Sequence, residues 1–171
     1  TVQDADGNTT TVQVWANIGD AEIFVSPTGN DTNDGLTPAT ALASLYQACG
    51  DAYDAGAGSG TSTAIIRMAA GTYTESAGSS YASSRMFIVG GHDANFVYDP
   101  ENNETFVDYP TTSGIILSGP STSGSLIMDN HIRFSAAASL IQGINAAYNA
   151  HIVSNTIEQT GAITGIGDVV G

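Results

Sequence analysis

The sequence has almost no positive charge. It contains no lysine, and 3 arginines stand against 17 aspartates and glutamates, so the formal net charge is −14. Nucleic-acid binding needs clustered cations that neutralise phosphates, and docking on an anionic membrane needs basic side chains near the lipid surface. Because Arg67, Arg85 and Arg133 are scattered along the chain, we expect neither kind of partner.

Cysteine and long apolar runs are also scarce. The single cysteine, Cys49, cannot form an intramolecular disulfide, and its apolar neighbours predict a small buried side chain rather than a reactive thiol. No apolar run approaches the roughly 18 residues that span a bilayer, so we expect no membrane-spanning helix. Ser, Thr, Asn and 20 Gly replace charged residues, which favours an extracellular or cell-surface location. The chain starts at Thr1 without a leader, and we interpret it as a processed chain or a piece of a longer one.

Only one segment has a helical period. Apolar residues recur at i, i+3, i+4 and i+7 spacing from Leu42 to Tyr53, and Gly56 follows them. This spacing predicts an amphipathic helix over about residues 39–55. The rest of the chain consists of short aliphatic pieces broken by Gly, Asn, Ser or Asp, a pattern that is typical of strands.

Two of these aliphatic pieces match each other. Residues 127–132 and 152–157 both read I-x-x-N-x-I, at a separation of 25 residues. In a coil of stacked turns, an asparagine at a tight corner can form a ladder of amide hydrogen bonds with its equivalent in the next turn, and Asn130 and Asn155 are the candidates. The pattern therefore favours an all-β parallel β-helix, a solenoid. Ordinary turn asparagines in a β-sandwich are the alternative.

Four motifs extend this interpretation, because together they resemble the N-terminal region of secreted right-handed parallel β-helix proteins of the pectate-lyase-like superfamily. The resemblance covers about residues 21–160 and implies that the predicted helix caps the open end of a right-handed coil. Residues 92–113 are too polar for a turn of such a coil and predict a loop. The motifs, in chain order, are FVSPTGNDTNDG at residues 24–35, PATALASL at 38–45, MAAGTYTE at 68–75 and VGGHDANF at 89–96.

The first residues carry a second resemblance. The string VQDADGNTTTVQV at residues 2–14 is similar to the last hairpin of bacterial and archaeal immunoglobulin-like surface domains. We therefore divide the chain into residues 1–20, a leading hairpin or donor strand, and residues 21–171, the parallel β-helix. A free strand can add to the sheet edge of a neighbour, and Val12, Val14 and Trp15 are the candidate assembly residues. Alternatively, Trp15 packs under the capping helix.

Two polar loops have the alternating oxygen ligands that hard cations prefer, around a glycine. We expect no required cofactor, and ordinary Asx-turns are the favoured alternative to a structural Ca²⁺ ion in both loops. Three Asn-x-Thr sequons are candidates for N-glycosylation, a number that chance alone explains. The Ca²⁺ candidates are Asp31, Asn33 and Asp34 in one loop and Asp4, Asp6 and Asn8 in the other, and the sequons start at Asn8, Asn30 and Asn103.

Catalytic patterns are weak. Lyases of the resembled superfamily place Arg or Lys and Ca²⁺-binding carboxylates on one outer sheet, whereas the arginines of this chain are scattered. A glycosidase needs two carboxylates facing each other across a sugar. The candidate pairs are Asp129 with Glu158 and Asp93 with Asp108, and neither pair repeats at a spacing that would place it on one face. We therefore lean away from an enzyme and name no catalytic residue.

The sequence favours an extracellular structural, adhesive or filament-forming surface protein that assembles through strand addition or stacking of turns. The expected partners are copies of itself or neighbouring surface-protein domains. The alternative is a carbohydrate-active enzyme, a polysaccharide lyase or glycosidase, with its catalytic turns unrecognised or outside this chain. A carbohydrate-binding module is a weaker option, because the tyrosines that would form an aromatic row are irregularly spaced.

Overall fold

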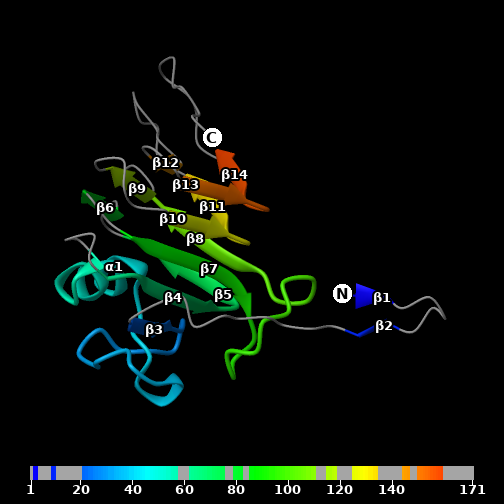
Figure 1. Cartoon of the computed structure of the whole chain (residues 1–171), viewed down its shortest axis with the longest axis horizontal. Coiled ribbons are helices and arrows are strands. Elements are labelled where there is room, and N and C mark those ends of the chain that lie inside the picture. Colours follow the sequence, from blue (N-terminus) through cyan, green and yellow to red (C-terminus); the bar gives the residue numbers. More distant parts are fainter. Residues whose placement is uncertain are drawn as a thin grey trace.

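The computed structural model describes residues 2–3, 9–10, 21–57, 62–75, 79–82, 85–110, 115–118, 125–134, 144–146 and 150–159. Within these residues most strands run parallel in small sheets. Helix α1 (Leu45–Asp54) and strand β3 (Ala21–Val25) lie at one end of the arrangement, and β13 (Ala150–Val153) and β14 (Thr156–Gln159) lie at the other (Figure 1). The two ends therefore differ in what covers them.

Three parallel sheets and one antiparallel pair form in the described part of the chain. Their hydrogen-bonded orders are β13-β10-β7-β4-β3, β14-β11-β8-β5 and β12-β9-β6, and β1 pairs with β2. The remaining bounds are β1 Val2–Gln3, β2 Thr9–Thr10, β4 Ala64–Ala69, β5 Gly71–Thr74, β6 Ser79–Ala82, β7 Met86–His92, β8 Thr105–Tyr109, β9 Ile115–Ser118, β10 Ser125–Met128, β11 His131–Phe134 and β12 Ile144–Ala146.

A column of isoleucines runs through the first sheet. The parallel register aligns Ile23, Ile66, Ile88, Ile127 and Ile152 on successive strands. The first four side chains are at most 2% exposed. Branched aliphatic side chains pack well against their equivalents on a pleated surface, and their burial is the main favourable term in folding. The isoleucine column therefore holds the strands of this sheet in one register.

The second sheet has a matching inward column. Tyr73, Val107, Ile132 and Ile157 are aligned by the pairing of β5, β8, β11 and β14. Tyr73 is buried, and its hydroxyl donates to the carbonyl oxygens of Val25 and Ala69 at 3.0 and 2.7 Å. These hydrogen bonds satisfy the buried phenol and tie the second sheet to the first.

Helix α1 covers the β3 end. It contacts β3, β4 and β6, and its buried residues are Leu45, Ala48, Cys49 and Ala52. The predicted helix over residues 39–55 starts too early, because Ser44 is the N-cap and accepts from the backbone nitrogen of Gln47 at 3.1 Å. Before it, only the short 3₁₀ helix η1 (Pro38–Thr40) forms.

The predicted all-β, right-handed parallel β-helix is wrong. The described residues form small parallel sheets together with a packed helix, an α/β-like arrangement, and no solenoid is shown. The physical reason is that short aliphatic strands have the same sequence pattern in any parallel sheet with a buried face. The pattern therefore predicted parallel strands without fixing the architecture that holds them.

The polar loop and the first residues of the chain can also be compared with what the sequence predicted. The polar loop predicted over residues 92–113 is interrupted by β8, whose residues Thr105, Val107 and Tyr109 are buried, so the loop is confined to residues 93–104. Val2–Gln3 pairs antiparallel with Thr9–Thr10, a short ladder within the predicted leading hairpin.

Candidate functional site

The most distinctive surface of the structure is the strand–turn–strand segment of residues 150–159, which we call the terminal edge. In the described residues, β13 pairs only with β10, and β14 pairs only with β11. Ile152 is 37% exposed, although Ile127 at the same position of the preceding strand is 0% exposed. The terminal edge thus presents an apolar column to solvent together with a row of strand backbone groups.

The corner of the terminal edge repeats the corner below it. Asp129 and Ser154, at equivalent positions, both have positive φ angles, of 55° and 52°. Asn155 Oδ1 accepts from the backbone nitrogen of Asn130 at 3.1 Å, and Asn155 Nδ2 donates to the carbonyl oxygen of Ile127 at 2.7 Å. The structure therefore joins the two asparagines that the sequence nominated, through hydrogen bonds between the Asn155 side chain and the backbone of the layer below.

Each of these asparagines also holds its own turn. Asn130 Nδ2 donates to the carbonyl oxygen of Met128 at 2.7 Å, and Asn155 Nδ2 donates to that of Val153 at 2.9 Å. Short polar side chains tolerate such left-handed corners because they bond the local backbone. Two layers therefore share one repeating corner geometry.

An alternating charge column runs along the outer face of the second sheet. Register aligns Asp108, Arg133 and Glu158 on β8, β11 and β14. Arg133 Nε and Nη2 donate to the two carboxylate oxygens of Asp108 at 2.5 and 2.8 Å, and the guanidinium lies over the Phe106 ring at 4.3 Å. Hydrogen bonding to Asp108 raises the pKa of Arg133, and the nearby Glu158 adds to this. Among the described strands, Glu158 is the last member of the column.

The opposite end of the first sheet is closed. The backbone nitrogen of Phe24 donates to Gly35, Leu42 donates to Phe24, and Ser26 donates to Leu42, at 2.8 to 2.9 Å. Leu42 is 0% exposed, and a Cβ added at Gly35 would lie 3.0 Å from it. Residues 35–42 thus occupy the free side of β3, and the outward hydrogen-bonding groups of Phe24 are satisfied there.

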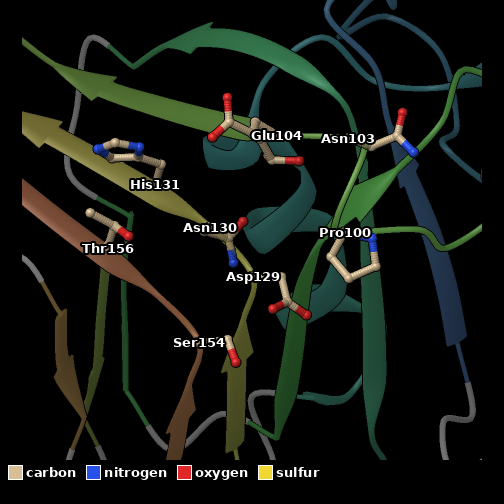
Figure 2. Close-up of a pocket in the computed structure, with 9 residues that line it drawn as sticks. Pro100, Asn103, Glu104, Asp129, Asn130, His131, Ser154 and Thr156 are labelled. Atoms are coloured by element: carbon tan, nitrogen blue, oxygen red, sulfur yellow. The ribbon is translucent and has the colours of Figure 1, made fainter. Parts of the chain in front are cut away.

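A small polar pocket borders the two corners. Figure 2 shows Asp129 and Ser154 at the turns that follow β10 and β13, with Pro100 and Glu104 on the neighbouring loop. The hydroxyl of Tyr98 donates to the Asp129 carboxylate. Burial raises the pKa of Tyr98, and the interaction with Asp129 raises it further. The pocket volume is about 140 Å³.

His92 lies buried behind this loop. Its side chain is 0% exposed, and its Nε2 is 3.4 Å from Arg67 Nη1. Burial, followed by the positive charge of Arg67, lowers the pKa of His92 to about 4. Arg67 in turn forms an ion pair with Glu22. This group could not be found from the sequence, because the residues around His92 along the chain do not show which side chains the register of β3, β4 and β7 brings together.

Glu75 is a second buried ionisable group that the sequence did not single out. Its carboxylate accepts from the backbone nitrogens of Leu45 and Tyr46 at 2.7 and 3.2 Å, at the N-terminus of α1. Burial raises the Glu75 pKa, and the two hydrogen bonds oppose this. The arrangement anchors the helix to the sheet, because an anion is favourable beside the free N–H groups of a first turn.

The first predicted Ca²⁺ loop uses its oxygen atoms within the protein. Asp31 Oδ1 accepts from the backbone nitrogens of Ala43 and Ser44 at 2.8 and 2.9 Å. Asp34 Oδ1 accepts from Thr40 Oγ1 at 2.6 Å, and this hydrogen bond lowers the Asp34 pKa. Asn33 Nδ2 donates to the Ala41 carbonyl at 3.1 Å. No group of three or more His, Cys, Asp or Glu suited to a metal occurs in the part of the chain that the structure describes.

Several nominated residues lie outside the described residues: Asp4, Asp6 and Asn8 of the second Ca²⁺ loop, and the assembly residues Val12, Val14 and Trp15. Two sequons are described. Asn30 is exposed and its Oδ1 accepts from the Thr32 backbone nitrogen at 3.0 Å, whereas Asn103 is half-buried and donates to the Asp99 carbonyl at 2.9 Å. Glycosylation at these sites stays a prediction.

The carboxylates considered for sugar cleavage each contact another group. Asp129 accepts from Tyr98, and Glu158 lies 3.2 Å from His131 Nε2. Asp108 is paired with Arg133, and Asp93 accepts from the backbone nitrogens of Asn95 and Val97. These contacts give each carboxylate a local structural role.

Comparison with protein-family models finds no match, and no curated protein or solved structure matches the chain. Among the described residues, no helix combines the length and apolar character needed to cross a bilayer. The function therefore has to be argued from the geometry of this chain.

Proposed function

We propose that this protein is an extracellular structural or adhesive module that assembles with a neighbouring surface-protein domain by accepting a strand–turn–strand segment at the terminal edge. The observation that carries the proposal is the exposure of Ile152, at 37%, in a column whose other members are at most 2% exposed. An added strand would bury the remaining exposed part of this side chain, which contributes about a third of the roughly 1.5 to 3 kcal/mol for burying a whole isoleucine side chain.

Backbone geometry supports strand addition at this edge. A strand at the end of a sheet offers N–H and C=O groups that an incoming strand can pair, and this mode of recognition gives affinity through the main chain. Both β13 and β14 end their sheets in the described residues, so one strand–turn–strand segment could extend the two sheets together. The same segment would cover the half-buried Ile157 on β14.

The two ends of the structure have different properties, and this difference favours a neighbouring domain over a second copy. The free side of β3 is occupied by residues 35–42, so a second copy cannot offer β3 to the terminal edge. Two terminal edges brought together would join chains that each carry a net charge of −14. Like charges in such an arrangement disfavour association.

The small polar pocket does not favour a carbohydrate-active enzyme. Its volume of about 140 Å³ is below the roughly 300 to 1,000 Å³ of ordinary ligand pockets. Its carboxylate Asp129 is already hydrogen-bonded to Tyr98. We therefore make no second proposal from this pocket.

Retention of the protein on its native cell surface tests the proposal. We expect the wild-type chain to stay with the surface fraction, and the Ile152→Asp variant to be released into the medium, because a carboxylate at this position cannot be buried in the apolar column. Leu36→Asp is the matched control, because Leu36 is exposed, at 60%, and lies at the opposite end. We expect it to be retained.

Thermal unfolding of both purified variants separates release from misfolding, and the milder Ile152→Ala variant gives a second reading if Ile152→Asp does not fold. Equal retention of the wild-type protein and a folded Ile152 variant would overturn the proposal. Recovery of the wild-type chain entirely in the medium would also overturn it.

A further inference from the structure

We infer that the segment accepted by the terminal edge has the pattern aliphatic-x-x-Asn-x-aliphatic-basic and belongs to the neighbouring surface-protein domain. This inference rests on the proposed function and deepens it by stating the chemistry of the partner. It is drawn from the register of β10–β11 beneath β13–β14, in which each position of one layer lies beside a known position of the next.

The aliphatic positions follow from the two inward columns. Ile127 lies beside Ile152, and Ile132 lies beside Ile157. Both lower residues are 0% exposed because the upper layer covers them. A segment that covers the terminal edge in the same register places its own two aliphatic residues beside Ile152 and Ile157.

The asparagine follows from the corner. In the described pair of layers, the upper asparagine accepts the backbone N–H of the lower one and donates to the carbonyl of the lower strand, through Asn155 onto Asn130 and Ile127. An asparagine in the incoming segment would make the same two hydrogen bonds to Asn155 and Ile152. If the backbone N–H of Asn155 and the carbonyl of Ile152 stayed unpaired beneath an added strand, they would cost more free energy than they do in a corner open to water.

The basic position follows from the outer charge column. Asp108, Arg133 and Glu158 alternate in sign, and the next position in register lies beside Glu158. The Glu158 side chain is 48% exposed, and His131 lies on its inner side at 3.2 Å. A lysine or arginine of the incoming segment would continue the alternation, as opposite charges on neighbouring strands stabilise a sheet and like charges destabilise it.

The described strands of this chain do not supply the segment. Its pattern I-x-x-N-x-I-R occurs at residues 127–133, which already pair with strands on both sides, and residues 152–158 end in Glu. Of the described arginines, Arg67 is engaged with Glu22 and Arg133 with Asp108. We therefore take the neighbouring domain of the proposed function as the source of the segment.

The chain nevertheless provides an ideal probe, because a synthetic peptide with the sequence of residues 125–134, SLIMDNHIRF, carries the required pattern. We expect the peptide to bind the full-length protein, measured by calorimetry and by NMR shifts that map to residues 150–159. Its R133E form should bind at least about 5-fold more weakly, and its N130A form about 10-fold more weakly.

A charge swap is the decisive control. With the Glu158→Arg protein, the R133E peptide should bind more tightly than the unmodified peptide, reversing the wild-type preference. A preference that does not reverse, equal binding of all three peptides, or the absence of peptide binding would each overturn the inferred pattern. None of these results bears on surface retention, so failure of the pattern is distinguishable from failure of strand addition itself.

Discussion

Protonation of His92 is expected to destabilise the fold as the pH falls. The ring is 0% exposed and beside Arg67, and its pKa is lowered from 6.5 to about 4. The unfolded chain therefore binds a proton at this residue below pH 6.5, whereas the folded protein does not until about pH 4. Stability consequently falls as the pH is lowered through this window, by about 3 kcal/mol at roughly 1.4 kcal/mol for each pH step.

Denaturant unfolding of the wild-type protein and of His92→Phe at pH 7, 5.5 and 4 measures this term. The expected result is a difference in free energy of unfolding between the two proteins that changes by about 3 kcal/mol in favour of the variant between pH 7 and pH 4. Other titrating groups cancel in this difference, including Glu75, whose raised pKa acts in the opposite sense.

Phenylalanine keeps an aromatic ring beside Phe96 and Tyr98, which His92 contacts. The matched control is His151→Phe, which makes the same substitution at a histidine that is exposed on β13. A His92→Phe protein whose stability follows the wild-type pH curve would refute the assignment of His92 as the buried neutral group.

Three further predictions concern the layers themselves. In Gly90→Ala, the new Cβ would lie 2.2 Å from the carbonyl oxygen of Asp129, so we expect a loss of at least about 2 kcal/mol in thermal unfolding, and an unchanged midpoint would contradict the close approach. Asn155→Ala should cost about 2 kcal/mol and speed amide exchange at Asn130, whose N–H it accepts, whereas unchanged exchange would show that this hydrogen bond is not formed. Ile127→Ala should cost about 3 kcal/mol and Ile152→Ala under about 1 kcal/mol in denaturant titrations, because their exposures are 0% and 37%, and equal costs would disprove the exposed column.

The strands were predictable from the sequence because each one is a short aliphatic segment with turn-forming residues on both sides. The match between residues 127–132 and 152–157 also nominated Asn130 and Asn155, which the structure joins by hydrogen bonds. The architecture was not predictable from the same signal, because parallel strands with a buried face share one pattern in many folds. The start of α1 was placed too early because Leu42 fits the helical spacing but pairs with β3 instead.

The polar part of the site was largely invisible to sequence reasoning. Asp108, Arg133 and Glu158 follow one another at steps of 25 residues along the chain, and only the strand register brings them together as a column. His92 and Arg67 meet for the same reason, since β7 lies beside β4. A sequence comparison that scored outer positions at the repeat separation of 25 residues could have found the charge column, but it had no signal for the buried histidine.

Amide hydrogen exchange of the surface-bound protein, compared with the purified protein, tests strand addition at the terminal edge most directly. The account predicts that backbone amides of residues 150–159 exchange more slowly in the surface-bound state, while those of Ser125–Met128, already between two strands, keep their rates. Equal exchange of residues 150–159 in both states would contradict it.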